Sequence, residues 1–210
     1  MSRIFIVSLF SVSVFLLSSC SDSIETPPVT ESSSSLASQS VSGELEYSST
    51  TDIALDLTAT YWYLDSENKS YSSGSLSELI SHTPYTIVYF YPKDGTPNCT
   101  IQALDFSLMK WEFLQAGYEI IGVSSDSVDS HMLFAEKNAL KIKLLEDASG
   151  ALLEQFGNKW PLQTYGNGDD VTDIRRSTFI IDSTGKAIYA FRDITANGHA
   201  RRIYELVTRR

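Results

Sequence analysis

The distribution of apolar residues predicts strands and helices in alternation along the second half of the chain. Residues 86–91 form a continuous β-branched and aromatic run, typical of a buried strand, and Pro92 ends it. Apolar side chains then recur every three or four positions, which predicts one helix over residues 100–116, closed by Gly117. A second apolar run predicts another strand at residues 118–124.

Downstream of this strand the alternation continues. Residues 127–138 predict a helix with Val128, Met132 and Ala135 on its buried side. The other expected elements are a strand at 144–147, a helix at 151–156, a hairpin of strands at 178–182 and 187–191, and a last helix at 198–209. This order predicts an α/β fold. A strand, a loop and a helix that begins at a cysteine are typical of the thioredoxin-like fold, here with a central mixed β-sheet flanked by helices.

The first residues have the features of an export signal. Arg3 precedes a short apolar stretch, and residues 17–20 read Leu-Ser-Ser-Cys, which resembles the lipobox of bacterial lipoproteins. The resemblance implies a signal peptide at 1–19 and a lipid on Cys20. It also implies a lipid-anchored protein of the bacterial cell envelope, and Ser21 after the cysteine favours the outer membrane, facing the periplasm. An ordinary signal peptide that happens to end in a cysteine is the alternative.

Composition separates a tether from a folded domain. Residues 20–50 are rich in serine and poor in apolar residues, so we expect a flexible tether there and a single domain over 51–210. The formal net charge is −10, and nine of the 26 acidic residues lie between positions 21 and 68, where no lysine or arginine occurs. Because the charge is negative, nucleic-acid binding is not expected.

Cys99 is the candidate reactive residue. It lies at the first turn of a predicted helix, where unpaired N–H groups favour an anion, and Thr96 can place a hydroxyl beside its sulfur. Pro92 and Pro97 restrict the loop. A buried, inert thiol is the alternative on chemistry alone.

The remaining cysteine and histidines narrow the possible chemistry. The chain has two cysteines, Cys20 and Cys99, so a Cys-x-x-Cys dithiol is excluded. None of the three histidines, His82, His131 and His199, is close to Cys99 in the sequence. Each is expected in a surface or capping position.

The loop around Cys99 carries a family signature. Residues 92–99, Pro-Lys-Asp-Gly-Thr-Pro-Asn-Cys, match the pattern Pro-x-x-x-Thr-x-x-Cys, and the chain resembles the peroxiredoxins of the bacterioferritin-comigratory (Q-type) branch. The resemblance continues at 122–131, at 134–137 and at 176–186, and covers nearly all of residues 52–210.

The resemblance implies a role for each site residue. Cys99 would be the peroxidatic nucleophile, Thr96 would hydrogen-bond the peroxide and the thiolate, and Pro92 would shield the site from water. Arg176 would hold the thiolate charge and polarise the peroxide. Arg175 competes for this role, but adjacent strand residues point to opposite faces, so only one of the two is expected to reach the site.

Two positions depart from the pattern of the relatives. Gln102 stands where many relatives have glutamate, which puts a glutamate-dependent contact in doubt. Many relatives carry a resolving cysteine five residues after the first, and here that position is Leu104. With Cys20 lipidated, no intramolecular disulfide can form.

The expected function is therefore a thiol-dependent peroxidase with a one-Cys cycle. It would reduce hydrogen peroxide or organic hydroperoxides, and an external thiol, either a thioredoxin-like protein or a small thiol, would regenerate it. No cofactor or metal is expected, and the chain would be a monomer or a weak dimer. The alternative is a catalytically weak, membrane-tethered thioredoxin-fold module for binding or redox sensing.

Overall fold

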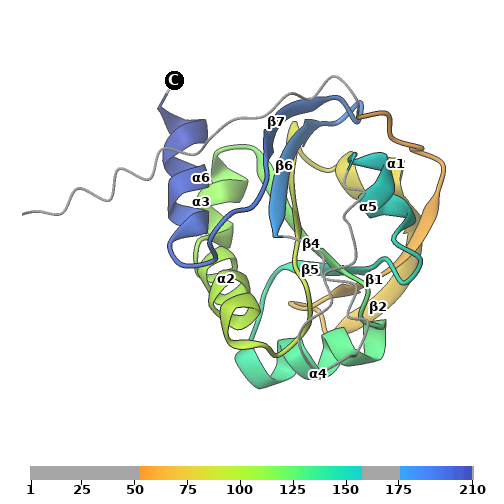
Figure 1. Cartoon of the computed structure of the whole chain (residues 1–210), viewed down its shortest axis with the longest axis vertical. Helices are drawn as coiled ribbons and strands as arrows, with labels where there is room; N and C mark the ends of the chain where they lie inside the picture. Colours follow the sequence, from red (N-terminus) through yellow and green to blue (C-terminus); the bar gives the residue numbers. More distant parts are fainter. Residues whose placement is uncertain (1–52, 158–175, 210) are drawn as a thin grey trace, which may run out of the picture. The chain divides into compact units, whose positions relative to one another are not determined.

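The computed structural model describes residues 53–157 and 176–209. Within these residues the chain forms one mixed seven-stranded sheet with helices on both faces (Figure 1). In spatial order the strands are β2 (Ser70–Ser75), β1 (Thr60–Asp65), β5 (Lys143–Glu146), β4 (Tyr118–Ser124), β3 (Tyr85–Phe90), β6 (Ser177–Asp182) and β7 (Ala187–Phe191). The predicted thioredoxin-like fold with a central mixed sheet is confirmed.

Each face of the sheet has its own helices and its own hydrophobic core. The helices are α1 (Leu76–Ile80), α2 (Pro97–Leu108), α3 (Lys110–Gln115), α4 (Val128–Asn138), α5 (Ala151–Gln155) and α6 (His199–Thr208). The core with α2, α3, α4 and α6 contains Cys99, and α1 and α5 pack on the opposite face. In Figure 1, α2, α3 and α6 lie to the left of β6 and β7, and α1 and α5 lie to the right.

The centre of the sheet is parallel and buried on both faces. β3 pairs with β4, and β4 with β5, in parallel, whereas β6 and β1 flank this centre antiparallel. All seven residues of β4 are buried. Two covered faces explain why β3, and β4 apart from Glu119, appear as apolar runs in the sequence rather than as alternating patterns.

The structure corrects the prediction of one helix over 100–116. The helix begins earlier, at Pro97, and ends at Leu108, where Met109 leaves helical geometry at φ −96° and ψ 8° and separates α2 from α3. The apolar spacing continues across this break because both helices pack against the same core.

The prediction for the helix at 127–138 is right in extent and partly wrong in orientation. Ser127 accepts a hydrogen bond from the backbone N–H of Ser130 and caps α4. The buried side consists of His131, Phe134 and Ala135, while Val128 and Met132 are half-buried.

The sequence pattern did not reveal the first hairpin, β1 and β2, or the short helix α1. In β2, which reads Ser-Tyr-Ser-Ser-Gly-Ser, every residue is exposed or half-buried. Its strand geometry follows from pairing with β1, so no apolar pattern predicts it.

Several predictions fall on residues outside the described part of the chain. These are the signal peptide at 1–19, the tether at 20–50 with Cys20, and Arg175. Among the helices of residues 53–157 and 176–209, none combines the length and apolarity that a membrane span requires.

Candidate active site

The loop after β3 places Cys99 in the first turn of α2. Thr96 is the N-cap residue in an extended conformation, at φ −72° and ψ 150°, and Pro97 occupies the first helical position, which its fixed φ angle suits. Cys99 is therefore the third helical residue, where unpaired backbone N–H groups favour a negative charge. Its side chain is 1% exposed, and the thiol is free.

Arg176, directly before β6, faces this sulfur from the other side of the site. Arg176 Nη2 donates to Cys99 Sγ at 3.3 Å. Its other terminal nitrogen, Nη1, donates to Oε1 of Gln102, one helical turn after Cys99. The guanidinium is thus held by a neutral amide through one nitrogen and faces the sulfur of Cys99 with the other. Arg175, the competing residue, lies outside the described residues.

Thr96 and Pro92 form the loop side of the site. The Thr96 hydroxyl donates to the backbone carbonyl of Lys93 at 3.1 Å. Since its hydrogen is used in this bond, the oxygen lone pairs of Thr96 remain as acceptors. Pro92 is half-buried and follows Tyr91, whose backbone N–H donates to the carbonyl of Val123 at 3.0 Å.

Tyr89 lies beneath the site, fully buried between two aromatic rings. Its ring stacks on Phe106 at 4.7 Å and on Tyr91 at 5.5 Å between centroids. Burial raises the pKa of Tyr89 well above its usual value, and the negative charges of Cys99 and Asp94 raise it further. The hydroxyl is therefore neutral, and within the described residues it has no hydrogen-bond partner.

Two of the three histidines contradict the predicted surface or capping positions. His131 and His199 are both 0% exposed, whereas His82 is exposed as expected. His131 Nδ1 lies 2.8 Å from Asp94 Oδ2, and His199 Nε2 lies 2.9 Å from the Thr178 hydroxyl. Burial, with the charges of two nearby arginines, lowers the pKa of His199 to about 3, so it is neutral in the core.

A weak signal in the sequence marks one of these two residues, His131. His131 lies three and four positions before Phe134 and Ala135, on the apolar side of α4.

No group of three or more His, Cys, Asp or Glu side chains in residues 53–157 and 176–209 has the arrangement of a metal site.

Comparisons with known proteins establish the family of the chain. The model of the AhpC/TSA family matches residues 51–190. Peroxiredoxin Bcp of Xanthomonas campestris is 38% identical over 151 residues, which are 71% of this chain and 91% of the relative. The chain belongs to the peroxiredoxin family. It is a thiol-dependent peroxidase, and its substrates are a peroxide and a thiol reductant.

Other relatives and solved structures place this peroxiredoxin in the Bcp, or peroxiredoxin Q, branch. Peroxiredoxin Bcp of Bacillus subtilis is 41% identical over 115 residues, covering 55% of this chain and 72% of the relative. The structure of Xanthomonas campestris peroxiredoxin Q superimposes with a TM-score of 0.61 at 32% identity, covering 75% of this chain and 97% of the other. A structure of the bacterioferritin comigratory protein from the same organism, described for its alkyl peroxide reduction activity, gives 0.61 at 31% identity over 74% and 97%.

The structure thus brings together three of the four residues that the resemblance assigned to the peroxiredoxin site. Cys99 and Arg176 are in contact, and Thr96 caps the helix that carries Cys99. Pro92 stands at the start of the same loop. The lipidation candidate, Cys20, lies outside the described residues.

Proposed function

We propose that this peroxiredoxin reduces hydrogen peroxide and organic hydroperoxides through Cys99 and is regenerated by an external thiol. The observation that carries the proposal is the contact between Arg176 Nη2 and Cys99 Sγ at 3.3 Å, at the amino end of α2. A permanent cation and a helix N-terminus both favour the thiolate, which is the reactive form of cysteine. The described structure of the Xanthomonas campestris relative, with its alkyl peroxide reduction activity, supports the extension to organic hydroperoxides.

In the first half-reaction the Cys99 thiolate attacks the terminal oxygen of the peroxide. The S–O bond forms as the O–O bond breaks, so the sulfur becomes a sulfenic acid and the other oxygen leaves as an alkoxide or hydroxide, which takes up a proton. Arg176 stabilises the negative charge as it moves from sulfur to the departing oxygen. The Thr96 oxygen, whose hydrogen is bonded to Lys93, accepts the hydrogen bond of the peroxide O–H.

In the second half-reaction an external thiol reduces the sulfenic acid. One thiol attacks the sulfur and releases water, which gives a mixed disulfide, and a second thiol cleaves this disulfide and restores Cys99. Leu104 stands at the position of a resolving cysteine in many relatives, so this position offers no sulfur for an internal disulfide. The leucine is half-buried and packs against the core. We therefore infer a one-Cys cycle.

Rapid mixing with hydrogen peroxide tests the function directly. The full chain is expected to consume peroxide, and Cys99→Ser is expected to abolish the consumption, while Cys20→Ser serves as the matched control and retains it. Equal rates for the wild type and Cys99→Ser would contradict the proposal.

Mass spectrometry of the intact protein tests the one-Cys cycle. After one equivalent of peroxide without reductant, the expected product carries one added oxygen on Cys99. Excess peroxide is expected to add a second oxygen, because no internal thiol traps the sulfenic acid. A disulfide between Cys20 and Cys99 would overturn the one-Cys cycle without affecting the peroxidase function.

We also propose that the enzyme is anchored to the bacterial envelope through a lipid on Cys20, in the outer membrane and facing the periplasm. The Leu-Ser-Ser-Cys sequence at 17–20 supports this, and Ser21 supports the choice of membrane. Incorporation of labelled palmitate, and its loss in Cys20→Ser together with release of the protein from membranes, would be the expected result. A wild type that stays unlabelled would refute the anchor.

A further inference from the structure

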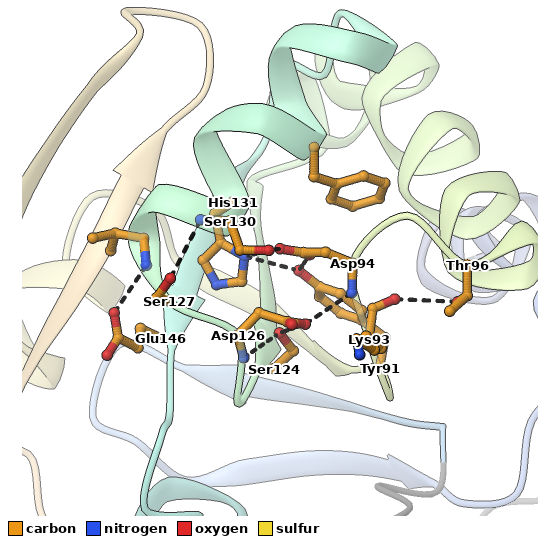
Figure 2. A network of polar contacts seen from close by, with 12 residues as sticks. Tyr91, Lys93, Asp94, Thr96, Ser124, Asp126, Ser127, Ser130, His131 and Glu146 are labelled. Atoms are coloured by element: carbon orange, nitrogen blue, oxygen red, sulfur yellow. Dashed lines mark hydrogen bonds and ion pairs between the residues drawn. The ribbon is translucent and has the colours of Figure 1, made fainter.

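Asp94, in the loop between β3 and α2, receives hydrogen bonds from three side chains on two elements. Tyr91 Oη, at the end of β3, donates to Oδ1 at 2.8 Å. Ser130 Oγ and His131 Nδ1, both on α4, lie 2.8 Å from Oδ2. Figure 2 shows these groups converging on the carboxylate, and we call the four residues the Asp94 network.

The backbone of Asp94 is fixed as well. Its N–H donates to Asp126 Oδ2 at 2.8 Å, and the same oxygen accepts from the Ser124 hydroxyl at 2.9 Å (Figure 2). Ser124 is the last residue of β4, and Asp126 lies two residues after it. One loop residue is therefore bonded to the end of β3, to the segment after β4 and to the first turns of α4.

Burial makes these bonds strong and assigns the proton of His131. The side chain of His131 is 0% exposed and that of Asp94 6%. A carboxylate has no hydrogen to give, so Nδ1 carries the proton and donates. His131 Nε2 is buried without a hydrogen-bond partner in the described residues. Hydrogen bonds to a buried carboxylate are among the stronger ones in proteins.

The network is joined to the reactive cysteine through a short path in the loop. Fixing Asp94 also fixes the preceding carbonyl, that of Lys93, which accepts the Thr96 hydroxyl at 3.1 Å. The Thr96 carbonyl accepts the N–H of Thr100 at 2.9 Å and so begins the helix turn that contains Cys99. In this arrangement Cys99 is 1% exposed. A protein thiol is far bulkier than a peroxide, so its attack on a sulfur this deeply covered requires the loop to move away.

We propose that Asp94 and His131 are positioning residues that hold the loop 92–96 closed around Cys99. This inference rests on the proposed peroxidase function. In the closed state the thiolate, Thr96 and Arg176 are aligned for attack on the peroxide, and the same closure slows the attack of a bulky thiol on the sulfenic acid. Loss of the network therefore affects the two half-reactions in opposite directions.

Asp94→Ala tests this in the full chain, with Asp129→Ala, an exposed carboxylate on α4, as the matched control. We expect kcat/KM for hydrogen peroxide to fall roughly ten- to a hundredfold in Asp94→Ala. We expect the rate at which reduced thioredoxin reacts with the sulfenic acid, formed beforehand, to rise. Asp129→Ala is expected to change neither rate. An unchanged peroxide rate, or a parallel loss in both half-reactions, would overturn the proposal.

His131 supplies a second, graded test that separates positioning from simple instability. His131→Asn places an amide N–H where Nδ1 stands and is expected to keep much of the peroxide rate, while His131→Leu loses it; His82→Asn is the exposed control. Equal peroxide rates in the Asn and Leu variants would refute the role of this hydrogen bond.

Alkylation of Cys99 by a bulky maleimide needs no peroxide, so it tests closure separately from catalysis. Cys99→Ser provides the background from Cys20. Faster alkylation in Asp94→Ala than in the wild type supports the closed loop, and equal alkylation contradicts it. A wild type that consumes no peroxide would instead refute the proposed function.

Discussion

Replacing Arg176 by methionine removes the guanidinium that faces Cys99 while keeping a side chain of similar length. The expected result is a large loss in kcat/KM for peroxide, because the charge that moves from sulfur to the departing oxygen loses its counter-ion. Arg176 acts on the O–O–H group of the substrate, which hydrogen peroxide and organic hydroperoxides share. The loss is therefore expected to be similar for both.

The distance sets an upper bound on this effect. Arg176 Nη2 and Cys99 Sγ are 3.3 Å apart. Two unit charges at about that separation attract each other by about 5 kcal/mol at an effective dielectric constant of about 20. Arg176 is half-buried and shares its hydrogen bonds with Gln102, so the available part is smaller. Removing one such donor from a developing anion typically costs about 10²–10³ in rate, which is the loss we expect.

Rapid mixing of the reduced protein with each peroxide measures the loss. Arg176→Lys is expected to fall between wild type and Arg176→Met, because one ammonium group cannot reach Gln102 and Cys99 in the same way as a planar guanidinium. Arg201→Met is the control, since the Arg201 side chain is 74% exposed. A rate for Arg176→Met within about threefold of wild type, far below the loss of one such donor, would refute the assignment of Arg176 as the counter-ion.

Three further changes test other parts of the molecule. Thr96→Val is expected to lower kcat/KM for peroxide by about a hundredfold, because the hydroxyl is the acceptor for the peroxide O–H. Thr96→Ser is expected to restore most of it. Equal rates for Thr96→Val and the wild type would argue against that role. Because burial holds the pKa of His199 at about 3 against 6.5 in the unfolded chain, the unfolded chain binds an extra proton between these values. The free energy of unfolding should therefore fall by about 2 kcal/mol from about pH 7.5 to about pH 5, as measured by urea titrations. A free energy of unfolding of His199→Gln that falls as steeply as that of the wild type would contradict this. Gly122→Ala places a methyl group 2.6 Å from the Tyr89 hydroxyl in the filled core. The free energy of unfolding is therefore expected to fall by about 1–3 kcal/mol, and the urea midpoint with it; an unchanged midpoint would contradict this.

Local sequence was a good guide wherever one segment decides its own structure. The run at 86–91 became β3 because a strand covered on both faces is apolar throughout. Cys99, Thr96 and Pro92 lie within eight residues, so one loop and one helix start bring them together. Arg176 is 77 residues from Cys99, and it was predicted from a family resemblance rather than from any local pattern.

The Asp94 network was not predicted, because its partners are distant in sequence. Asp94 and His131 are 37 positions apart, and no local pattern links them. The orientation of α4 was misjudged for the same reason. Apolar spacing allows more than one buried side in a helix, and packing against the sheet and the loop chose the one with His131.

The sequence by itself therefore determined the fold class and the family, and it predicted the reactive cysteine, because these depend on apolar runs and on a signature contained in one short loop. Only the tertiary structure decided that β2 is a strand, that α2 ends at Leu108 and that His131 is buried. Only the tertiary structure also showed that Asp94 is bonded to α4. These features arise from contacts between segments far apart in the chain, whose free energies depend on burial and geometry that no local pattern contains.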